Sequence, residues 1–163
     1  MKEIIYIAIG LLCVKGSCQN TIEEVLNSYN DHSVPYIYVN ELSELTTQPL
    51  VFDTREQEEY DISHIEGAIP LGFKTFKLSE SAILPKDKNK MIVVYCSVGV
   101  RSEIIGKQLI EKGYTAVYNL YGGIFEWVNK GRKVYLNKKE TPKVHAYSKH
   151  WGNYLSKGTK VYE

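Results

Sequence analysis

The chain has 163 residues, of which 44% are hydrophobic and 24% charged, and it carries a net charge of +1 at pH 7. These values are typical of a soluble globular protein with one domain of ordinary size plus appendages. A net charge so close to zero gives no global argument for nucleic-acid binding, and we expect no nucleic acid as a partner.

The N-terminal stretch MKEIIYIAIGLLCVKGSCQN looks like an export signal. Its apolar run, residues 4–14, is too short for an ordinary transmembrane helix, and residues 16–18 include small side chains suited to cleavage. We therefore expect residues 1–18 to be a signal peptide and the mature chain to be exported to the periplasm. Two alternatives stay open: a lipoprotein acylated on Cys18, which Lys15 disfavours, and a buried N-terminal strand or helix.

The cysteine count directs attention to Cys96. Cys13 and Cys18 fall in the expected signal peptide, which leaves Cys96 as the one cysteine of the mature chain. A lone thiol in an oxidising compartment is a liability unless it is used or buried. Cys96 is therefore either a reactive nucleophile or an inert core residue.

Helical and extended patterns alternate along the rest of the chain. Thr21 and Glu24 have the spacing of a capping box and predict a helical lead-in within residues 19–34. The apolar runs and turn residues predict strands at 35–39, 50–53, within 64–71, at 91–95 and at 116–120. The helical patterns lie at 40–45, with Asn40 as the cap, and at 55–61, 102–114 and 122–131.

This alternation indicates an α/β fold with a largely parallel central sheet flanked by helices. In such sheets, sites form at the carboxyl ends of the strands. Asp53 ends one expected strand and Cys96 directly follows another, so we expect both side chains at that edge of the sheet.

The loop YCSVGVRS, which follows the apolar run MIVV, has the composition of an anion-binding loop. It leads into a helix, and the N-terminus of a helix presents several backbone N–H groups to one point. Gly99 lets the backbone turn, and Arg101 adds a fixed positive charge. We expect these features to favour the thiolate of Cys96, which is the nucleophilic form of a cysteine.

Protein tyrosine phosphatases are one of two classes of enzyme that use a loop of this kind. Protein tyrosine phosphatases place five residues between the cysteine and the arginine, in a loop that wraps a phosphate. Here four residues separate Cys96 from Arg101. The shorter loop makes a smaller cradle, suited to one sulfur atom on the cysteine, and it disfavours a phosphatase-like activity.

Three segments resemble, in order, the motifs of single-domain rhodaneses, the sulfurtransferase family: VFDTREQEEYDISHIEGAIPL, IVVYCSVGVRS and LYGGIFEWVNKG. The resemblance covers roughly residues 35–131 and implies a rhodanese-like domain there. It also implies that the Cys96 thiolate attacks the outer sulfur of a donor such as thiosulfate, a mercaptopyruvate-like thiol or a persulfide. A Cys96 persulfide then forms, and a thiol, cyanide or a protein cysteine removes the sulfur. No metal or organic cofactor is implied.

The same resemblance assigns roles around the nucleophile. The persulfide would be held by the loop that contains Ser97, Val98, Gly99, Val100, Arg101 and Ser102. Arg101 either contacts a bound anion or braces the loop through a salt bridge. Asp53, Arg55 and His64 are expected to be supporting, structural residues. The uncharged Ser97 and Val98 weaken the case for dianionic thiosulfate as the natural donor.

The expected function is thus that of a thiosulfate or thiol sulfurtransferase, with a small sulfur donor and a thiol acceptor, or a partner protein's persulfide, as its partners. The alternative is a persulfide-carrying or sensing module that exchanges sulfur with one partner protein only.

The last segment, residues 132–163, is a basic and aromatic extension. It holds eight Lys/Arg and two Asp/Glu, a local net charge of +6, whereas the remaining residues have a net charge of −5. The aromatic and apolar side chains recur at steps of three and four and predict a short helix: Val144, Tyr147, Trp151 and Tyr154. This helix either packs on the catalytic domain or presents a docking surface for an acidic partner or a membrane.

Overall fold

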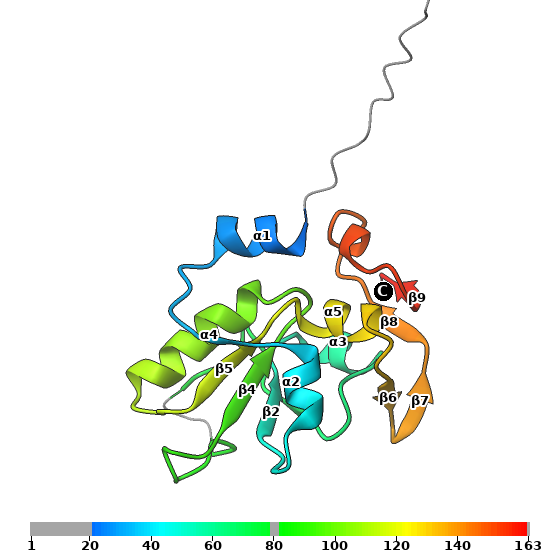
Figure 1. Ribbon diagram of the computed structural model, residues 1–163. Coiled ribbons are helices and arrows are strands. Elements are labelled where there is room, and N and C mark those ends of the chain that lie inside the picture. Colours follow the sequence, from blue (N-terminus) through cyan, green and yellow to red (C-terminus); the bar gives the residue numbers. More distant parts are fainter. Residues whose placement is uncertain (1–20, 79–81, 163) are drawn as a thin grey trace, which may run out of the picture.

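The computed structural model describes residues 21–78 and 82–162. The expected signal peptide at residues 1–18, with Cys13 and Cys18, lies outside the described residues. The centre of the fold is a five-stranded parallel sheet in the order β1-β5-β4-β2-β3 (Figure 1). Its strands are β1 (Tyr36–Ile37), β2 (Leu50–Asp53), β3 (Ile69–Pro70), β4 (Ile92–Tyr95) and β5 (Val117–Leu120).

The middle strand β4 is buried on both faces, as its unbroken apolar sequence predicts. It pairs in parallel with β2, where Val51 lies opposite Val93, and with β5. Successive side chains of a strand point to opposite faces, so Val93 and Tyr95 join one hydrophobic cluster and Ile92 and Val94 the other.

Helices cover both faces of this sheet. The helices are α1 (Ile22–Tyr29), α2 (Val39–Glu44), α3 (Gln57–Tyr60), α4 (Val100–Glu111) and α5 (Gly123–Asn129). On one face α4 packs through Ile105 and Leu109, while α1, α2 and α5 contribute to the other core. Ile104 and Ile110, on the outer side of α4, are 47% and 37% exposed. The α/β fold with a mostly parallel sheet flanked by helices is therefore confirmed.

The helix ends show where local sequence decides the structure. The capping box of α1 is present, because the Thr21 hydroxyl accepts from the N–H of Glu24 and the Glu24 carboxylate accepts from the N–H of Thr21. The prediction of Asn40 as the cap of the next helix is wrong. That helix, α2, starts at Val39 after Tyr38, whose N–H donates to the Glu41 carboxylate.

The helix expected in the C-terminal extension is also absent from the described residues. The segment forms an antiparallel pair, β6 (Val134–Leu136) and β7 (Lys139–Thr141), and a parallel pair, β8 (Lys143–His145) and β9 (Thr159–Val161). Between β8 and β9, Tyr147 has a left-handed φ of 63°, which an α-helix cannot contain. The short 3-10 helix η1 (Trp151–Tyr154) follows it.

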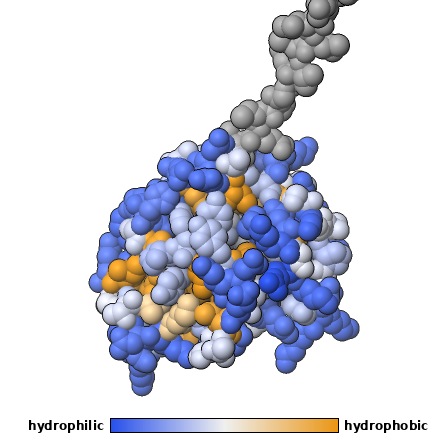
Figure 2. Space-filling view, viewed as in Figure 1, coloured by the Kyte–Doolittle hydropathy of each residue, from blue (hydrophilic) through white to orange (hydrophobic). Residues whose placement is uncertain are grey.

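The part of the extension that follows β8 reaches the end of the molecule where α1 lies (Figure 1). The ring of Tyr29 on α1 lies 6.0 Å from the ring of Trp151 in η1, which links the two segments directly. Hydrophilic residues cover much of the face seen in Figure 2, with apolar patches among them. Over the described residues, the helices are too short or too polar to cross a membrane.

Candidate active site

Cys96 follows the last residue of β4, at the carboxyl edge of the parallel sheet, and only 1% of its surface is exposed. Its Sγ accepts a hydrogen bond from the N–H of Gly99 at 3.2 Å. The loop then enters α4 directly, so the positive end of that helix faces the sulfur. The strand–cysteine–loop–helix arrangement expected from the sequence is present.

The loop is fixed from behind by side chains of other elements. Gly99 has a φ of 110°, and a Cβ there would lie 3.2 Å from Leu26 of α1. The carbonyl oxygen of Gly99 accepts from the side-chain amides of Asn119, at 2.8 Å, and of Asn30, at 3.1 Å. Ser102 donates its hydroxyl to Asn119 at 2.7 Å. The loop is therefore tied to β5 and to the end of α1.

The glycine pair at 122–123 lets α5 approach the nucleophile loop. The backbone N–H groups of Ile124 and Phe125 donate to the carbonyl oxygens of Cys96 and Ser97 at 2.9 and 3.1 Å. A Cβ on Gly123 would lie 2.3 Å from the Cys96 carbonyl oxygen, so a side chain cannot fit. The contact between α5 and the loop therefore fixes the backbone on both sides of Cys96.

The electrostatics favour a thiolate. Burial raises the pKa of the Cys96 thiol, but the charge of Arg101 and the N–H groups of Ser102 and Gly99 outweigh it, and that pKa lies below its ordinary value. A larger fraction of the sulfur is therefore anionic at neutral pH than in a free cysteine.

Arg101 braces the loop rather than standing free at its rim. Its two terminal nitrogens donate to the Glu59 carboxylate at 2.6 and 2.8 Å, and one also donates to the Ser97 hydroxyl at 3.0 Å. The side chains of Arg101 and Glu59 are 17% and 4% exposed. Burial raises the pKa of Glu59, but the hydrogen bonds and charge of Arg101 lower it by more, so the net shift is downward and the pair is ionic. The salt-bridge alternative for Arg101 describes this geometry.

Replacing Arg101 with alanine should therefore harm both the thiolate and the fold. We expect the midpoint of Cys96 alkylation by iodoacetamide to move to higher pH, because the nearby positive charge is gone. We also expect kcat/KM to fall roughly tenfold to a thousandfold for charged and neutral donors alike, and the melting temperature to fall because Glu59 is left buried without its partner. Arg101→Lys should rescue these losses only in part. An unchanged alkylation midpoint and an unchanged melting temperature would contradict the bracing role.

Asp53 and Arg55 form a second buried ion pair behind the loop, with both side chains 0% exposed. Arg55 Nη2 donates to Asp53 at 2.6 Å and to the carbonyl oxygen of Ser63 at 2.6 Å. The Tyr95 hydroxyl donates to Asp53 at 2.7 Å and accepts from the N–H of Ile65 at 3.2 Å. Since Tyr95 immediately precedes Cys96, this network fixes the strand that presents the nucleophile and stands apart from the sulfur.

His64 lies in a turn away from the sulfur. Its ring stacks on that of Tyr60, with centroids 3.9 Å apart, and its Nδ1 is 3.1 Å from the Tyr60 carbonyl oxygen. Its backbone pairs with Tyr135 of the C-terminal extension. These contacts fit the structural role that the sequence predicts for His64.

A small cavity of about 120 Å³ opens over Cys96. It is lined by five residues of the loop and by two from the C-terminal extension: Cys96, Ser97, Val98, Val100, Arg101, Tyr147 and Trp151. Sequence reasoning missed Tyr147 and Trp151 at the site, and it missed Glu59 as the partner of Arg101. Glu59 could have been found, because it is the acid of the Glu-Tyr pair in the first motif.

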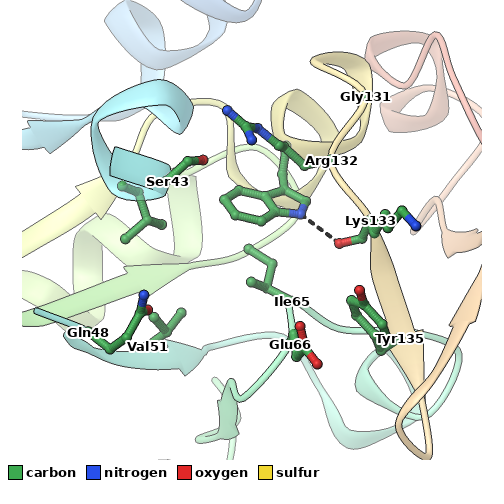
Figure 3. A pocket seen from close by; sticks show the side chains of 11 residues that line it. Ser43, Gln48, Val51, Ile65, Glu66, Gly131, Arg132, Lys133 and Tyr135 are labelled. Carbon is green, nitrogen blue, oxygen red and sulfur yellow. Dashed lines mark hydrogen bonds between the residues drawn. The ribbon is translucent and has the colours of Figure 1, made fainter. Parts of the chain in front are cut away.

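A second cavity, of about 440 Å³, lies between α2, the turn at residues 65–66 and the start of the C-terminal extension (Figure 3). The half-buried Trp127 lines it and donates its indole N–H to the carbonyl oxygen of Lys133 at 2.9 Å. Cys96 and the loop after it do not contribute to this cavity.

The described residues lack a group of side chains of the kind that binds metal ions in proteins. No three His, Cys, Asp or Glu side chains among them form a group that could hold a metal ion. The chemistry that the arrangement offers is that of a thiolate that accepts a backbone N–H beneath a small, largely apolar cavity.

Solved structures share this fold. A rhodanese-related protein from Thermoplasma volcanium is 29% identical, with a TM-score of 0.56 over 63% of this chain and 99% of that one. A thiosulfate sulfurtransferase from Pseudomonas aeruginosa is 21% identical, with a TM-score of 0.59 over 82% of this chain and 25% of that one. At that identity the second structure supports the fold alone.

Curated relatives include tRNA uridine(34) hydroxylases. The one from Hamiltonella defensa is 33% identical over 63% of this chain and 30% of its own length, and the one from Yersinia pestis is 29% identical over 74% and 36%. The chain thus spans about a third of the length of these relatives. The family model for the rhodanese-like domain matches residues 38–130, more than half of the chain, and the protein therefore belongs to the rhodanese-like domain family.

Proposed function

We propose that this protein is a sulfurtransferase that carries a sulfane sulfur on Cys96 and passes it to a thiol or to cyanide. The observation that carries the proposal is the Sγ atom of Cys96, held at the mouth of a parallel strand with a lowered pKa and a hydrogen bond from Gly99. A thiolate in this setting is an activated nucleophile.

The reaction has two half-reactions. The Cys96 thiolate attacks the outer sulfur of thiosulfate, the bond between the two donor sulfurs breaks, and sulfite leaves with the electron pair. The product, a Cys96 persulfide, is anionic and can accept hydrogen bonds from the N–H groups of Gly99 and Ser102, which lower the pKa of the thiol now. An acceptor thiolate then attacks the terminal sulfur, leaves with it as a persulfide, and restores the Cys96 thiolate. Charge and atoms balance in both steps without a metal or an organic cofactor.

The burial of Cys96 bears on the partner. With 1% of its surface exposed, the sulfur lies at the base of a cavity of about 120 Å³. The small volume of this cavity favours small donors and acceptors over a partner protein, whose cysteine would have to enter it. The alternative, a persulfide carrier that exchanges with one partner protein, would use the same thiol but would turn over slowly with every small acceptor.

The relatives are much longer than the part of them that this chain matches. The chain covers about a third of the tRNA uridine(34) hydroxylases and a quarter of the Pseudomonas thiosulfate sulfurtransferase, so their whole activities can depend on parts that match nothing here. Sulfur transfer is the coarser chemistry that the described site itself supports.

The test is to load the purified protein with thiosulfate, with mercaptopyruvate and with an organic thiosulfonate, and to weigh the intact chain. We expect a gain of one sulfur atom, which is lost when a thiol or cyanide is added. Rapid turnover with a small acceptor supports an enzyme. Loading without turnover would favour the carrier, and no loading from any of the donors would overturn the proposal.

We further propose that the chain is exported to the periplasm, with residues 1–18 acting as a cleaved signal peptide, on the strength of the apolar run that residues 4–14 form. Sequencing the N-terminus of the native protein tests this. A mature start at residues 17–19 is expected, and Met1 retained on cytoplasmic protein would overturn it.

A further inference from the structure

The wall of the Cys96 cavity is completed by residues outside the family-matched segment. The rhodanese-like domain model ends at residue 130, yet Tyr147 and Trp151 line the cavity together with the loop. The ring of Tyr147 lies under the guanidinium of Arg101, with Cζ 4.9 Å from the ring centroid. The C-terminal extension therefore contributes directly to the space in which the sulfur is transferred.

The segment that carries this wall is held in place on both sides. Strands β8 and β9 pair in parallel, the N–H of Ala146 donates to the carbonyl oxygen of Val161 at 2.7 Å, and Val144, Ala146 and Leu155 are fully buried. The N–H of Gly152 donates to the Ser148 carbonyl oxygen at 2.7 Å.

The ring of Trp151 is also packed on two sides. It lies 6.0 Å from the ring of Tyr29 and 5.9 Å from that of Tyr154. A side chain fixed in this way presents a preformed surface to a ligand, and little conformational freedom is lost on binding.

The charges around the cavity leave no surplus of positive charge for a dianion. Arg101 is the cation that lines it, and two of its nitrogens are already engaged by Glu59. His145 lies 3.9 Å from Glu59, and burial lowers its pKa, so the imidazole is neutral at pH 7. The rest of the lining is largely apolar: Val98, Val100, Tyr147 and Trp151.

The size of the cavity sets the size of the group it can hold. An apolar cavity of roughly 150 Å³ in another protein accommodates benzene. The cavity over Cys96, at about 120 Å³, is close to that scale. The volume therefore limits the bound group to about one ring or a short aliphatic chain between Trp151 and the loop.

We propose that the C-terminal extension, through Tyr147 and Trp151, makes the site selective for sulfur donors that carry a small apolar or aromatic group and at most one negative charge. The inference rests on the proposed function and specifies its substrate class. With an organic thiosulfonate anion, the Cys96 thiolate attacks the outer sulfur, the bond between the two sulfurs breaks, and a sulfinate leaves with the electron pair. The Cys96 persulfide forms, and two negative charges are present before and after.

The test compares kcat/KM for benzenethiosulfonate, methanethiosulfonate and thiosulfate with one thiol acceptor. We expect the native protein to prefer the benzene compound over the methane compound by roughly tenfold or more, the scale on which an apolar pocket discriminates. Thiosulfate should be the poorest of the three. Trp151→Ala and Tyr147→Ala should each reduce the ratio between the two thiosulfonates by about threefold to tenfold.

Tyr38→Ala is the matched control, because Tyr38 and Tyr147 are each 50% exposed and Tyr38 lines a different cavity. It should keep the native ratio. A ratio unchanged in both wall variants, or an equal loss with all three donors, would overturn the proposal while leaving sulfur transfer itself intact. Tyr147→Ala remains informative if Trp151→Ala fails to fold.

A second readout needs no sulfur transfer. The rates at which N-phenylmaleimide and N-ethylmaleimide modify Cys96 are followed on the peptide that contains it. We expect the phenyl reagent to be favoured in the native protein and that preference to shrink in Trp151→Ala. Failure of all donors to load Cys96 together with a Trp151-dependent preference here would refute the proposed function alone, whereas the same preference in both proteins would refute the selective wall.

Discussion

Replacing Cys96 with serine is expected to lower sulfur transfer by about 10⁴-fold or more, the scale of loss when an enzyme's nucleophile is removed. The reason is chemical, because a serine hydroxyl cannot hold a persulfide and is not ionised at neutral pH. The serine is nearly the same size and can accept the N–H of Gly99 that Sγ accepts now. We therefore expect the melting temperature to stay within a few degrees of the native value.

The measurement is the initial rate of sulfite release from thiosulfate and of sulfinate release from a thiosulfonate. Cys18→Ser, made in full-length protein that keeps residues 1–18, places the same substitution at one of the chain's two other cysteines and should keep the native rates. A Cys96→Ser protein that transfers sulfur as fast as its parent would show that the nucleophile lies elsewhere.

Arg55→Ala is expected to give the largest loss of stability. Its partner Asp53 would remain buried at 0% exposure with no cation beside it. Burial lowers the pKa of Arg55, but the charge of Asp53 outweighs it and holds the guanidinium ionised. Removing one partner of a buried pair costs about 3–5 kcal/mol, which in a chain of this size lowers the melting temperature by roughly 6–20 °C.

Urea denaturation measures this loss, and Lys133→Ala supplies the control. Lys133 and Glu140 form an ion pair at 2.6 Å whose side chains are 62% and 54% exposed. An exposed pair contributes only about 0–1 kcal/mol. If Arg55→Ala costs no more free energy of unfolding than Lys133→Ala, the buried network does not stabilise the strand that presents Cys96.

The parts of the fold that could be predicted are those that short-range physics decides. β2 and β4 are short apolar runs bounded by turns, and their residues follow directly from the sequence. The reciprocal bonds of Thr21 and Glu24 need only three residues of spacing. Cys96 at the end of β4 follows from the parallel sheet, because the carboxyl ends of such strands share one edge.

The parts that escaped prediction depend on contacts between distant residues. Glu59 and Arg101 are 42 positions apart, and no local pattern shows that a helix at one site delivers a carboxylate to a loop at the other. The spacing of Val144, Tyr147 and Trp151 imitates a helix. The extension instead pairs β8 with β9, and Tyr147 takes a left-handed φ of 63° that places its ring at Arg101. The spacing of so few side chains cannot distinguish a helix from two strands joined by an irregular segment.

The most direct measurement of the central claim is to locate the transferred sulfur on the chain. A donor carrying a heavy sulfur isotope in its outer position is mixed with the protein, the thiols are blocked with iodoacetamide, and the digested peptides are weighed. The peptide that contains Cys96 should carry one heavy sulfur, and that sulfur should move to an added thiol when the acceptor is supplied before blocking. Transfer to the thiol with the Cys96 peptide unlabelled throughout would contradict the account.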